Sequence, residues 1–134
     1  MSGLAHLLLK RGYPVSGSDT KESLLITMLK REGAEITLGH REENLKDSEV
    51  LVYSSCIQME NPEREEAERR SLQILSRGEL LSLLFKEKKI GIAVSGSHGK
   101  TTTTALATWL LQKAGLDPTY LIGGVSHKLG NNAE

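Results

Sequence analysis

The chain lacks several features that would place it in a class at once. It has a single cysteine, Cys56, in 134 residues, which excludes an internal disulfide framework and a cysteine-rich zinc site. Its 17 basic and 17 acidic residues cancel, so it has no net field drawing it to nucleic acid or to an anionic membrane. No apolar run approaches the roughly 20 residues that span a bilayer, and no signal-peptide pattern is present. We therefore expect a cytoplasmic protein in a reducing compartment, with no nucleic-acid or membrane partner.

Helical and strand periodicities alternate along the chain. The apolar spacing and the positions of glycine predict helices at 2–12, 21–33, 61–70, 76–85 and 101–115, and strands at 13–19, 34–39, 49–55, 72–76 and 88–96. Strands that alternate with helices of this length indicate a parallel sheet covered on both faces. The expected fold is therefore a Rossmann-like α/β domain, followed from about residue 87 by the start of a second α/β domain.

Local signals give these helices boundaries and faces. Asn61 followed by proline predicts a capped helix start, and Ser76 with Glu79 has the spacing of a capping box. In the helix predicted at 21–33, we expect one apolar face, formed by Leu24, Leu25, Met28 and Leu29. In the charged helix at 61–70, we expect surface pairs four residues apart, formed by Glu65 with Arg69 and Glu66 with Arg70.

One short segment, "SGSHGKTTTT" at 95–104, follows the apolar run "IGIAV" and opens the last predicted helix. A strand, a glycine-containing turn and a lysine–threonine pair at a helix start form a phosphate-binding loop. Glycines let backbone N–H groups surround phosphate oxygens, and the helix N-terminus adds a partial positive charge. Val94 occupies the place of the usual first glycine, so the prediction depends on this context; an ordinary glycine turn with a helix cap is the alternative.

The string "GSHGKTTT" resembles the ATP-binding loop of the Mur ligases of bacterial cell-wall synthesis. Other stretches occur in the order expected for the members that use L-alanine: "MSGLA", "VSGSD", "VYSSCI", "NPE" and "GLDPTYLIGG". The resemblance covers essentially all 134 residues. It implies that ATP phosphorylates the carboxylate of UDP-N-acetylmuramate and that the amine of L-alanine displaces the phosphate, in peptidoglycan synthesis.

The resemblance also implies a domain organisation. Residues 1–86 resemble the UDP-sugar-binding domain without its first strand and glycine turn, and 87–134 resemble the beginning of the central ATP-binding domain. The charged segment 87–89 is the expected linker. A lost first strand would leave its neighbours with unpaired edges. Oligomeric state is not predicted.

The resemblance assigns candidate roles residue by residue. In the loop, Lys100 would contact the β and γ phosphates of ATP and Thr101 would ligate Mg²⁺; the ATP site as a whole comprises Gly96, Ser97, His98, Gly99, Lys100, Thr101 and Thr102. His98 has two open interpretations, a residue that shapes the loop and one that contacts substrate.

The candidate UDP-sugar site consists of Asp19, His40, Ser54, Ser55, Gly123 and Gly124. Four of these residues, Asp19, His40, Ser54 and Ser55, lie at the ends of predicted strands, at the edge where parallel sheets bind ligands. Each has an alternative role: a helix cap for Asp19, a surface loop residue for His40 and turn formation for both serines and both glycines.

Three functional classes stay open. The first is the L-alanine ligase, the second is a sister ligase that attaches a recycled peptide to the same UDP sugar, and the third is a non-catalytic nucleotide-binding module. "VSGSD", and "SSCI" with "NPE", favour the first over the second.

We expect the 134 residues by themselves to make no amide bond. Amide synthesis needs three substrates held together and an acidic metal ligand, and Asp117 and Glu134 are poorly placed to serve as that ligand. The measurement is formation of UDP-N-acetylmuramoyl-L-alanine from ATP, L-alanine and the UDP sugar. Turnover equal to that of a complete ligase would contradict the expectation.

Overall fold

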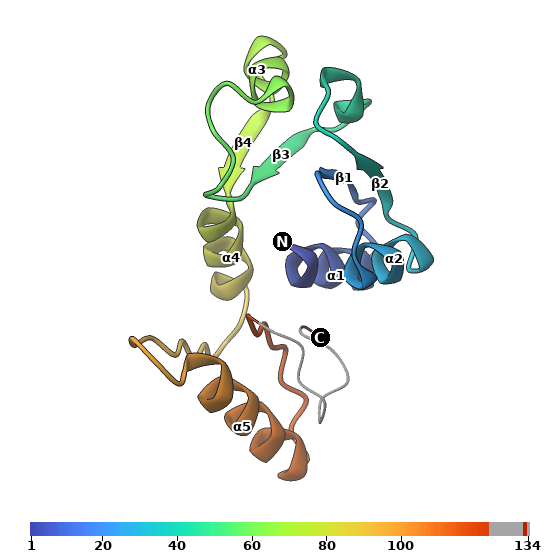
Figure 1. Cartoon of the computed structure of the whole chain (residues 1–134). Helices are drawn as coiled ribbons and strands as arrows, with labels where there is room; N and C mark the ends of the chain where they lie inside the picture. Colours follow the sequence, from blue (N-terminus) through green and yellow to red (C-terminus); the bar gives the residue numbers. More distant parts are fainter. Residues whose placement is uncertain (124–132, 134) are drawn as a thin grey trace. The chain divides into compact units, whose positions relative to one another are not determined.

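The computed structural model of the protein describes residues 1–123 and 133. The chain divides into two compact units, Met1–Lys89 and Ile90–Glu134, whose elements are labelled in Figure 1. In the first unit helices and strands alternate as predicted: α1 (Ser2–Lys10), β1 (Ser16–Asp19), α2 (Leu24–Arg31), β2 (Glu35–Leu38), the 3₁₀ helix η1 (Glu42–Leu45), β3 (Val50–Tyr53), α3 (Pro62–Arg69), β4 (Gln73–Ser76) and α4 (Arg77–Lys86).

The strands of the first unit pair in parallel, which confirms the predicted sheet type. β1 pairs with β2, with Ser16 opposite Glu35 and Asp19 opposite Leu38. β3 pairs with β4 in the same way, from Val50 opposite Gln73 to Tyr53 opposite Ser76. Among the described residues the four strands form two separate pairs, not the single sheet that the alternation predicted. The α/β fold class is as predicted, because each pair runs parallel and is joined through a helix.

Helices α1 and α2 pack on each other and supply much of the core of the first unit. Leu4 and Leu7 of α1 are buried, as are Ile26 and Leu29 of α2. The expected apolar face of α2 was partly wrong, because Leu24 is 83% exposed and Met28 is 41% exposed. α2 begins one residue after Ser23, whose hydroxyl accepts the amide of Ile26. Ile26 lies three residues before Leu29 and shares its buried face.

Polar side chains fix the start of α3 and of α4, as the sequence predicted. The Oδ1 of Asn61 accepts the amides of Glu63 and Arg64 at 3.0 and 3.4 Å. Ser76 and Glu79 form a complete capping box. Hydrogen bonds from Ser76 lower the pKa of the Glu79 carboxyl below its ordinary 4.5. The ionised Glu79 carboxylate therefore contributes its full stabilisation of the helix start above pH 4.5. This contribution is lost as the pH falls through the lower pKa that Glu79 has in the folded state.

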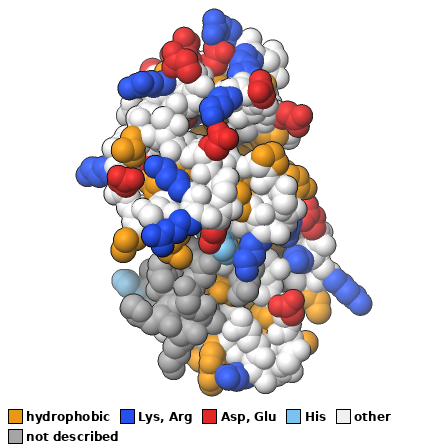
Figure 2. Space-filling model, turned by 90° about the vertical axis from the view of Figure 1, so that its right-hand side faces the viewer, with side chains coloured by type: hydrophobic (Ala, Val, Ile, Leu, Met, Phe, Trp, Pro, Cys, Tyr) orange, Lys and Arg blue, Asp and Glu red, His pale blue; other side chains and the backbone are white. Residues whose placement is uncertain are grey.

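The surface ion pairs of α3 differ from those expected at a spacing of four residues. Arg69 binds Glu66, three residues before it, and also lies 3.7 Å from Glu42 of η1. Arg70 donates to the carbonyl oxygen of Lys46 at 2.7 Å. Both arginines thus reach toward the 42–46 segment, because α3 packs against η1. Acidic and basic side chains are interspersed over the face drawn in Figure 2.

The second unit contains helix α5 (Lys100–Lys113), as predicted. Gly115, with φ +79°, ends it in the left-handed conformation that favours glycine. The strand predicted at 88–96 was wrong, because no described residue pairs with this segment and its Ile90 and Ile92 are 79% and 64% exposed. Hydrophobic periodicity indicates a strand, but a strand forms only where a second strand completes its hydrogen bonds. In the described part of the chain, no helix is both long and apolar enough to cross a bilayer.

We predict that Ser76→Ala lowers the free energy of unfolding by about 1 kcal/mol, because the first turn of α4 loses its cap. The measurement is urea denaturation at neutral pH followed by circular dichroism. Ser82→Ala, at an exposed position within the same helix, is the matched control and should change stability little. Equal stability of the two variants would contradict the prediction.

Candidate functional site

The ends of β1 and β2 bring two of the predicted site residues to one edge. The amide of Gly39 donates to the carbonyl of Asp19 at 2.9 Å, one step beyond the strand ladder. Gly39 has φ +84°, a conformation that L side chains rarely adopt, and nothing lies within 4 Å of a Cβ built there. This turn places His40 beside the end of β1, where its Nδ1 lies 2.7 Å from the hydroxyl of Ser18. His40 is therefore a partly buried member of a polar cluster and not a plain surface residue.

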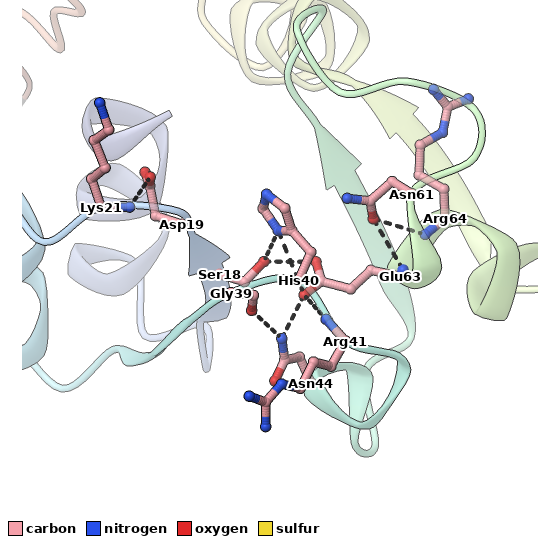
Figure 3. A network of polar contacts seen from close by, with 10 residues as sticks. All are labelled: Ser18, Asp19, Lys21, Gly39, His40, Arg41, Asn44, Asn61, Glu63 and Arg64. Carbon is pink, nitrogen blue, oxygen red and sulfur yellow. Dashed lines mark hydrogen bonds and ion pairs between the residues drawn. The ribbon is translucent and has the colours of Figure 1, made fainter.

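A carboxylate from α3 holds this cluster together, as Figure 3 shows. Glu63 Oε2 accepts the hydroxyl of Ser18 at 2.8 Å. Its Oε1 accepts the side-chain amide of Asn44 at 2.7 Å and the backbone amide of Arg41 at 3.4 Å. The side chain of Glu63 is only 13% exposed and that of His40 is 21% exposed. Charge-assisted hydrogen bonds of this kind fix side chains firmly when they are shielded from water.

Asp19 lies next to this cluster with its carboxylate exposed. Its Oδ1 accepts the amide of Lys21 at 3.2 Å, which makes a local turn after β1 (Figure 3). The alternative that Asp19 caps the following helix was wrong, because Ser23 caps α2. The turn leaves the other oxygen of Asp19 available at the end of the strand.

The serines after β3 make a turn, as their alternative interpretation proposed. The carbonyl of Ser54 accepts the amide of Ile57 at 2.9 Å, and its hydroxyl is 3.5 Å from the amide of Cys56. Ser55 and Cys56 are exposed in this turn. The turn contacts involve Ser54, and the Ser55 side chain is exposed. Contact of either serine with a nucleotide stays a prediction.

Arg64 anchors the loop that carries these serines. Its guanidinium lies 4.1 Å from the centre of the Tyr53 ring and donates to the carbonyl of Ile57 at 3.3 Å and to the sulfur of Met59 at 2.7 Å. Arg64 is 8% exposed, and its Nε has no hydrogen-bond partner among the described residues. The face of the guanidinium packs on the Tyr53 ring, and the N–H groups at its edge bind Ile57 and Met59 of the loop.

The turn before α5, where the phosphate loop is predicted, contains two glycines with positive φ. Gly96 and Gly99 have φ of +144° and +79°, both in the range that favours glycine. Gly99 precedes α5, and its carbonyl accepts the amide of Thr103 at 2.8 Å as the first hydrogen bond of the helix. The amides of 100–102 thus come before the first intrahelical bond and are the donors that a helix N-terminus offers to an anion.

Lys100 closes the loop on itself. Its ammonium donates to the carbonyls of Gly96 and Ser97 at 2.5 and 3.2 Å. These contacts fold the Lys100 side chain back onto the turn that precedes α5. All seven predicted ATP-site residues, His98 included, are exposed. The arrangement can bind an anion through one ammonium and several backbone amides.

Gly123 lies beside this loop within the second unit. A Cβ built on it would be 3.9 Å from the Thr101 hydroxyl, so the 120–123 segment approaches the helix start closely. Gly124 lies outside the described residues. Within the residues that the structure describes, no cluster of three or more histidine, cysteine or acidic side chains could hold a metal. Thr101, the predicted Mg²⁺ ligand, therefore has no such cluster beside it among the described residues.

Sequence reasoning missed the residues that organise the strand-end cluster, namely Ser18, Asn44 and Glu63. Glu63 was noted only within "NPE", and Ser18 only within "VSGSD". A carboxylate in the first turn of a helix has an ordinary explanation, its favourable interaction with the helix dipole. Only the packing of α3 against η1 shows that Glu63 reaches the end of β1.

Comparison with known proteins gives the chain a family. Residues 1–89 match the model described as "Mur ligase family, catalytic domain", which is more than half of the chain. The chain belongs to the Mur ligase family. This confirms the resemblance found in its motifs.

The individual relatives are all named as ligases that act on UDP-N-acetylmuramate. The UDP-N-acetylmuramate–L-alanine ligase of Aquifex aeolicus is 54% identical over all 134 residues, and that of Sulfurihydrogenibium is 48% identical. The chain spans 29% of the length of each of these ligases. Among solved structures, the UDP-N-acetylmuramate-alanine ligase of Thermotoga maritima matches with a TM-score of 0.93 and 30% identity, covering the whole chain and 32% of that protein. A UDP-N-acetylmuramate:L-alanyl-γ-D-glutamyl-meso-diaminopimelate ligase from Neisseria meningitides gives 0.91 and 31%, covering 99% of the chain and 42% of that protein.

We predict that Arg64→Lys speeds hydrogen exchange at the amide of Ile57, because lysine keeps the charge but loses the planar stacking on Tyr53 and part of the fork of donors. The measurement is residue-resolved exchange by NMR. Arg31→Lys, at an exposed position at the end of α2, is the control. An unchanged rate at Ile57 would show that Arg64 does not hold the loop.

Proposed function

We propose that this chain provides the UDP-sugar edge and the ATP loop of a ligase that joins L-alanine to UDP-N-acetylmuramate through an acyl phosphate. The observation that carries the proposal is the loop at 96–102, in which an ammonium and a helix N-terminus converge, in a chain whose relatives are named for that reaction. ATP-dependent phosphorylation would convert the carboxylate of the sugar into an acyl phosphate. The amine of L-alanine would then form the amide and release phosphate.

The loop residues fit the triphosphate of ATP. The carbonyls of Gly96 and Ser97 hold the Lys100 ammonium at the mouth of the loop, and phosphate oxygens are stronger acceptors that would draw it away. The amides of 100–102 would bind the same phosphates without any rearrangement of the helix start. Gly96 and Gly99 suit this loop because their positive φ is a backbone conformation that other residues rarely adopt.

Mg²⁺ fits this loop only in part. The Thr101 hydroxyl is exposed at the helix start, and a threonine at this place together with phosphate oxygens is a usual partial shell for Mg²⁺. When bound, the ion would neutralise charge on the phosphates during transfer. The described residues contain no cluster of three or more acidic, histidine or cysteine side chains that could complete the shell.

The strand-end edge of the first unit fits a nucleoside. Asp19 and His40 lie at adjacent strand ends, the position at which parallel sheets bind ligands. The exposed carboxylate of Asp19 can accept hydroxyls of a ribose, and the exposed Ser55 can add a hydroxyl from the next strand pair. Such a role is compatible with a protein of the cytoplasm, where UDP sugars and ATP are both present.

The peptide-recycling ligase is the second candidate. Its support is the structural match to the Neisseria enzyme, which has nearly the same TM-score and identity as the match to the L-alanine ligase. The curated relatives favour L-alanine, because those with 45 to 54% identity carry that name. A module that binds nucleotide without catalysis is the third candidate and is distinguished by the experiments below.

We predict that Lys100→Ala weakens binding of Mg²⁺–ATP at least about tenfold, since a hydrogen bond to a charged group contributes roughly 1.5–3 kcal/mol. The measurement is titration calorimetry on the 134-residue chain. Lys113→Ala, at the other end of α5, is the control for charge and should leave ATP affinity unchanged. Identical affinities for all three proteins would refute the loop assignment.

A chimera tests the catalytic part of the proposal. This chain would replace the 134 aligned residues of the Aquifex aeolicus ligase. The chimera is expected to form UDP-N-acetylmuramoyl-L-alanine, and Lys100→Ala within it is expected to abolish the product. A folded chimera that binds ATP but makes no product would favour the non-catalytic module.

A further inference from the structure

The hydrogen-bond cluster around Glu63 fixes more than the positions of its members. Glu63 uses both carboxylate oxygens, one toward Ser18 and the other toward Asn44 and the amide of Arg41. Ser18 stands between Glu63 and His40, at 2.8 Å from the carboxylate and 2.7 Å from the ring Nδ1. The direct distance from Nδ1 to the carboxylate is 3.9 Å, so the carboxylate acts on the ring chiefly through the serine hydroxyl.

The proton positions in this relay follow from the valence of each group. A carboxylate only accepts hydrogen bonds, and a serine hydroxyl has one proton to donate. The hydroxyl of Ser18 must give that proton to Glu63, because the opposite orientation would set two oxygens with lone pairs 2.8 Å apart. The Ser18 oxygen therefore accepts in its contact with His40. The proton of that contact must lie on Nδ1.

The consequence appears at the other side of the ring. With its proton on Nδ1, a neutral imidazole has a bare lone pair on Nε2. Figure 3 shows the ring of His40 with its second nitrogen directed away from Ser18 and Glu63. None of the described residues hydrogen-bonds to Nε2. His40 thus offers an acceptor at the strand-end edge, where the exposed carboxylate of Asp19 is also an acceptor.

We propose that Glu63 is a positioning residue which, through Ser18, holds His40 in the Nδ1–H tautomer, so that Nε2 accepts a hydrogen bond from a hydroxyl or N–H group of the bound nucleoside. The proposal rests on the proposed function in one respect, the assignment of this edge to the UDP sugar. The new element is that this edge favours ligands that donate a hydrogen bond to His40 Nε2. It also explains why a carboxylate is shielded at this place: an amide could supply a donor to Ser18 and reverse the relay.

The first test is the tautomer itself in the ligand-free 134-residue chain. Long-range ¹H–¹⁵N spectra distinguish protonated from bare ring nitrogens, and His40→Gln identifies the His40 signals. At the neutral limit of a pH titration, wild type should show the proton on Nδ1. Glu63→Gln and Ser18→Ala should both move it toward Nε2, and Ser18→Thr, which keeps the hydroxyl, should retain it on Nδ1.

Glu65→Gln is the matched control, since Glu65 lies on the same helix and is exposed. It should leave the His40 signals as in wild type. A wild-type ring with its proton on Nε2 would overturn the proposal, as would a tautomer that neither Glu63→Gln nor Ser18→Ala changes. A merely structural role for Glu63 would shift backbone signals without exchanging the two ring nitrogens.

The second test is titration of the same proteins with UDP, followed at the His40 ring. We expect UDP to bind about tenfold more weakly to Glu63→Gln and Ser18→Ala than to wild type, Ser18→Thr and Glu65→Gln. Equal UDP affinity in spite of an altered tautomer would overturn the positioning role. If wild type shows the expected tautomer but does not bind UDP, the assignment of the UDP site fails and the relay stands, so the two failures are distinguishable.

Discussion

The carboxylate of Glu63 is the constraint on which the strand-end edge depends. It joins the end of β1, the start of η1 and the first turn of α3 through hydrogen bonds of 2.7 to 3.4 Å. Shielding a carboxylate from water is unfavourable in free energy unless its oxygens accept hydrogen bonds. Here they accept from Ser18, from the amide of Arg41 and from Asn44, and the ring of His40 lies 3.9 Å away. The hydrogen bonds that satisfy this carboxylate also place Ser18 beside His40. The packing of α3 on η1 therefore also sets the geometry of the candidate site, because Glu63 of α3 makes both sets of contacts.

The two candidate sites use different chemistry because their expected ligands differ. The loop at 96–102 depends on backbone amides and glycine conformations, which suit phosphates of any attached group. The strand-end edge depends on side chains from separate elements, which suit the particular donors and acceptors of a nucleoside. This difference explains why the loop at 96–102 can be recognised as a short sequence motif. The other site is scattered over 45 residues between Ser18 and Glu63.

Several local features were predictable because they depend only on neighbouring residues. The caps at Asn61 and at Ser76 with Glu79 were predicted and are present. The face of α2 was predicted only in part: Leu29 is buried as expected, but Leu24 and Met28 are exposed and Ile26 is buried instead. The packing of α1 on α2, and not the spacing alone, decides which of these side chains are buried. The strand at 88–96 was wrong for a related reason. Its sequence has the right residues, but a strand needs a paired neighbour, and no local pattern supplies one.

The sequence by itself determined the family, the parallel α/β class and the candidate loop, because glycine conformations, caps and hydrophobic periods are properties of short segments. Tertiary structure alone decided the pairing of the strands and the partners of the surface arginines. It also decided the role of Glu63. These depend on which segments distant in the chain meet, and in particular on the packing that brings a helical carboxylate within 2.8 Å of a strand-end hydroxyl. Hydrogen bonds are short and directional, so a proton relay such as this one exists only when its three members are held together in space.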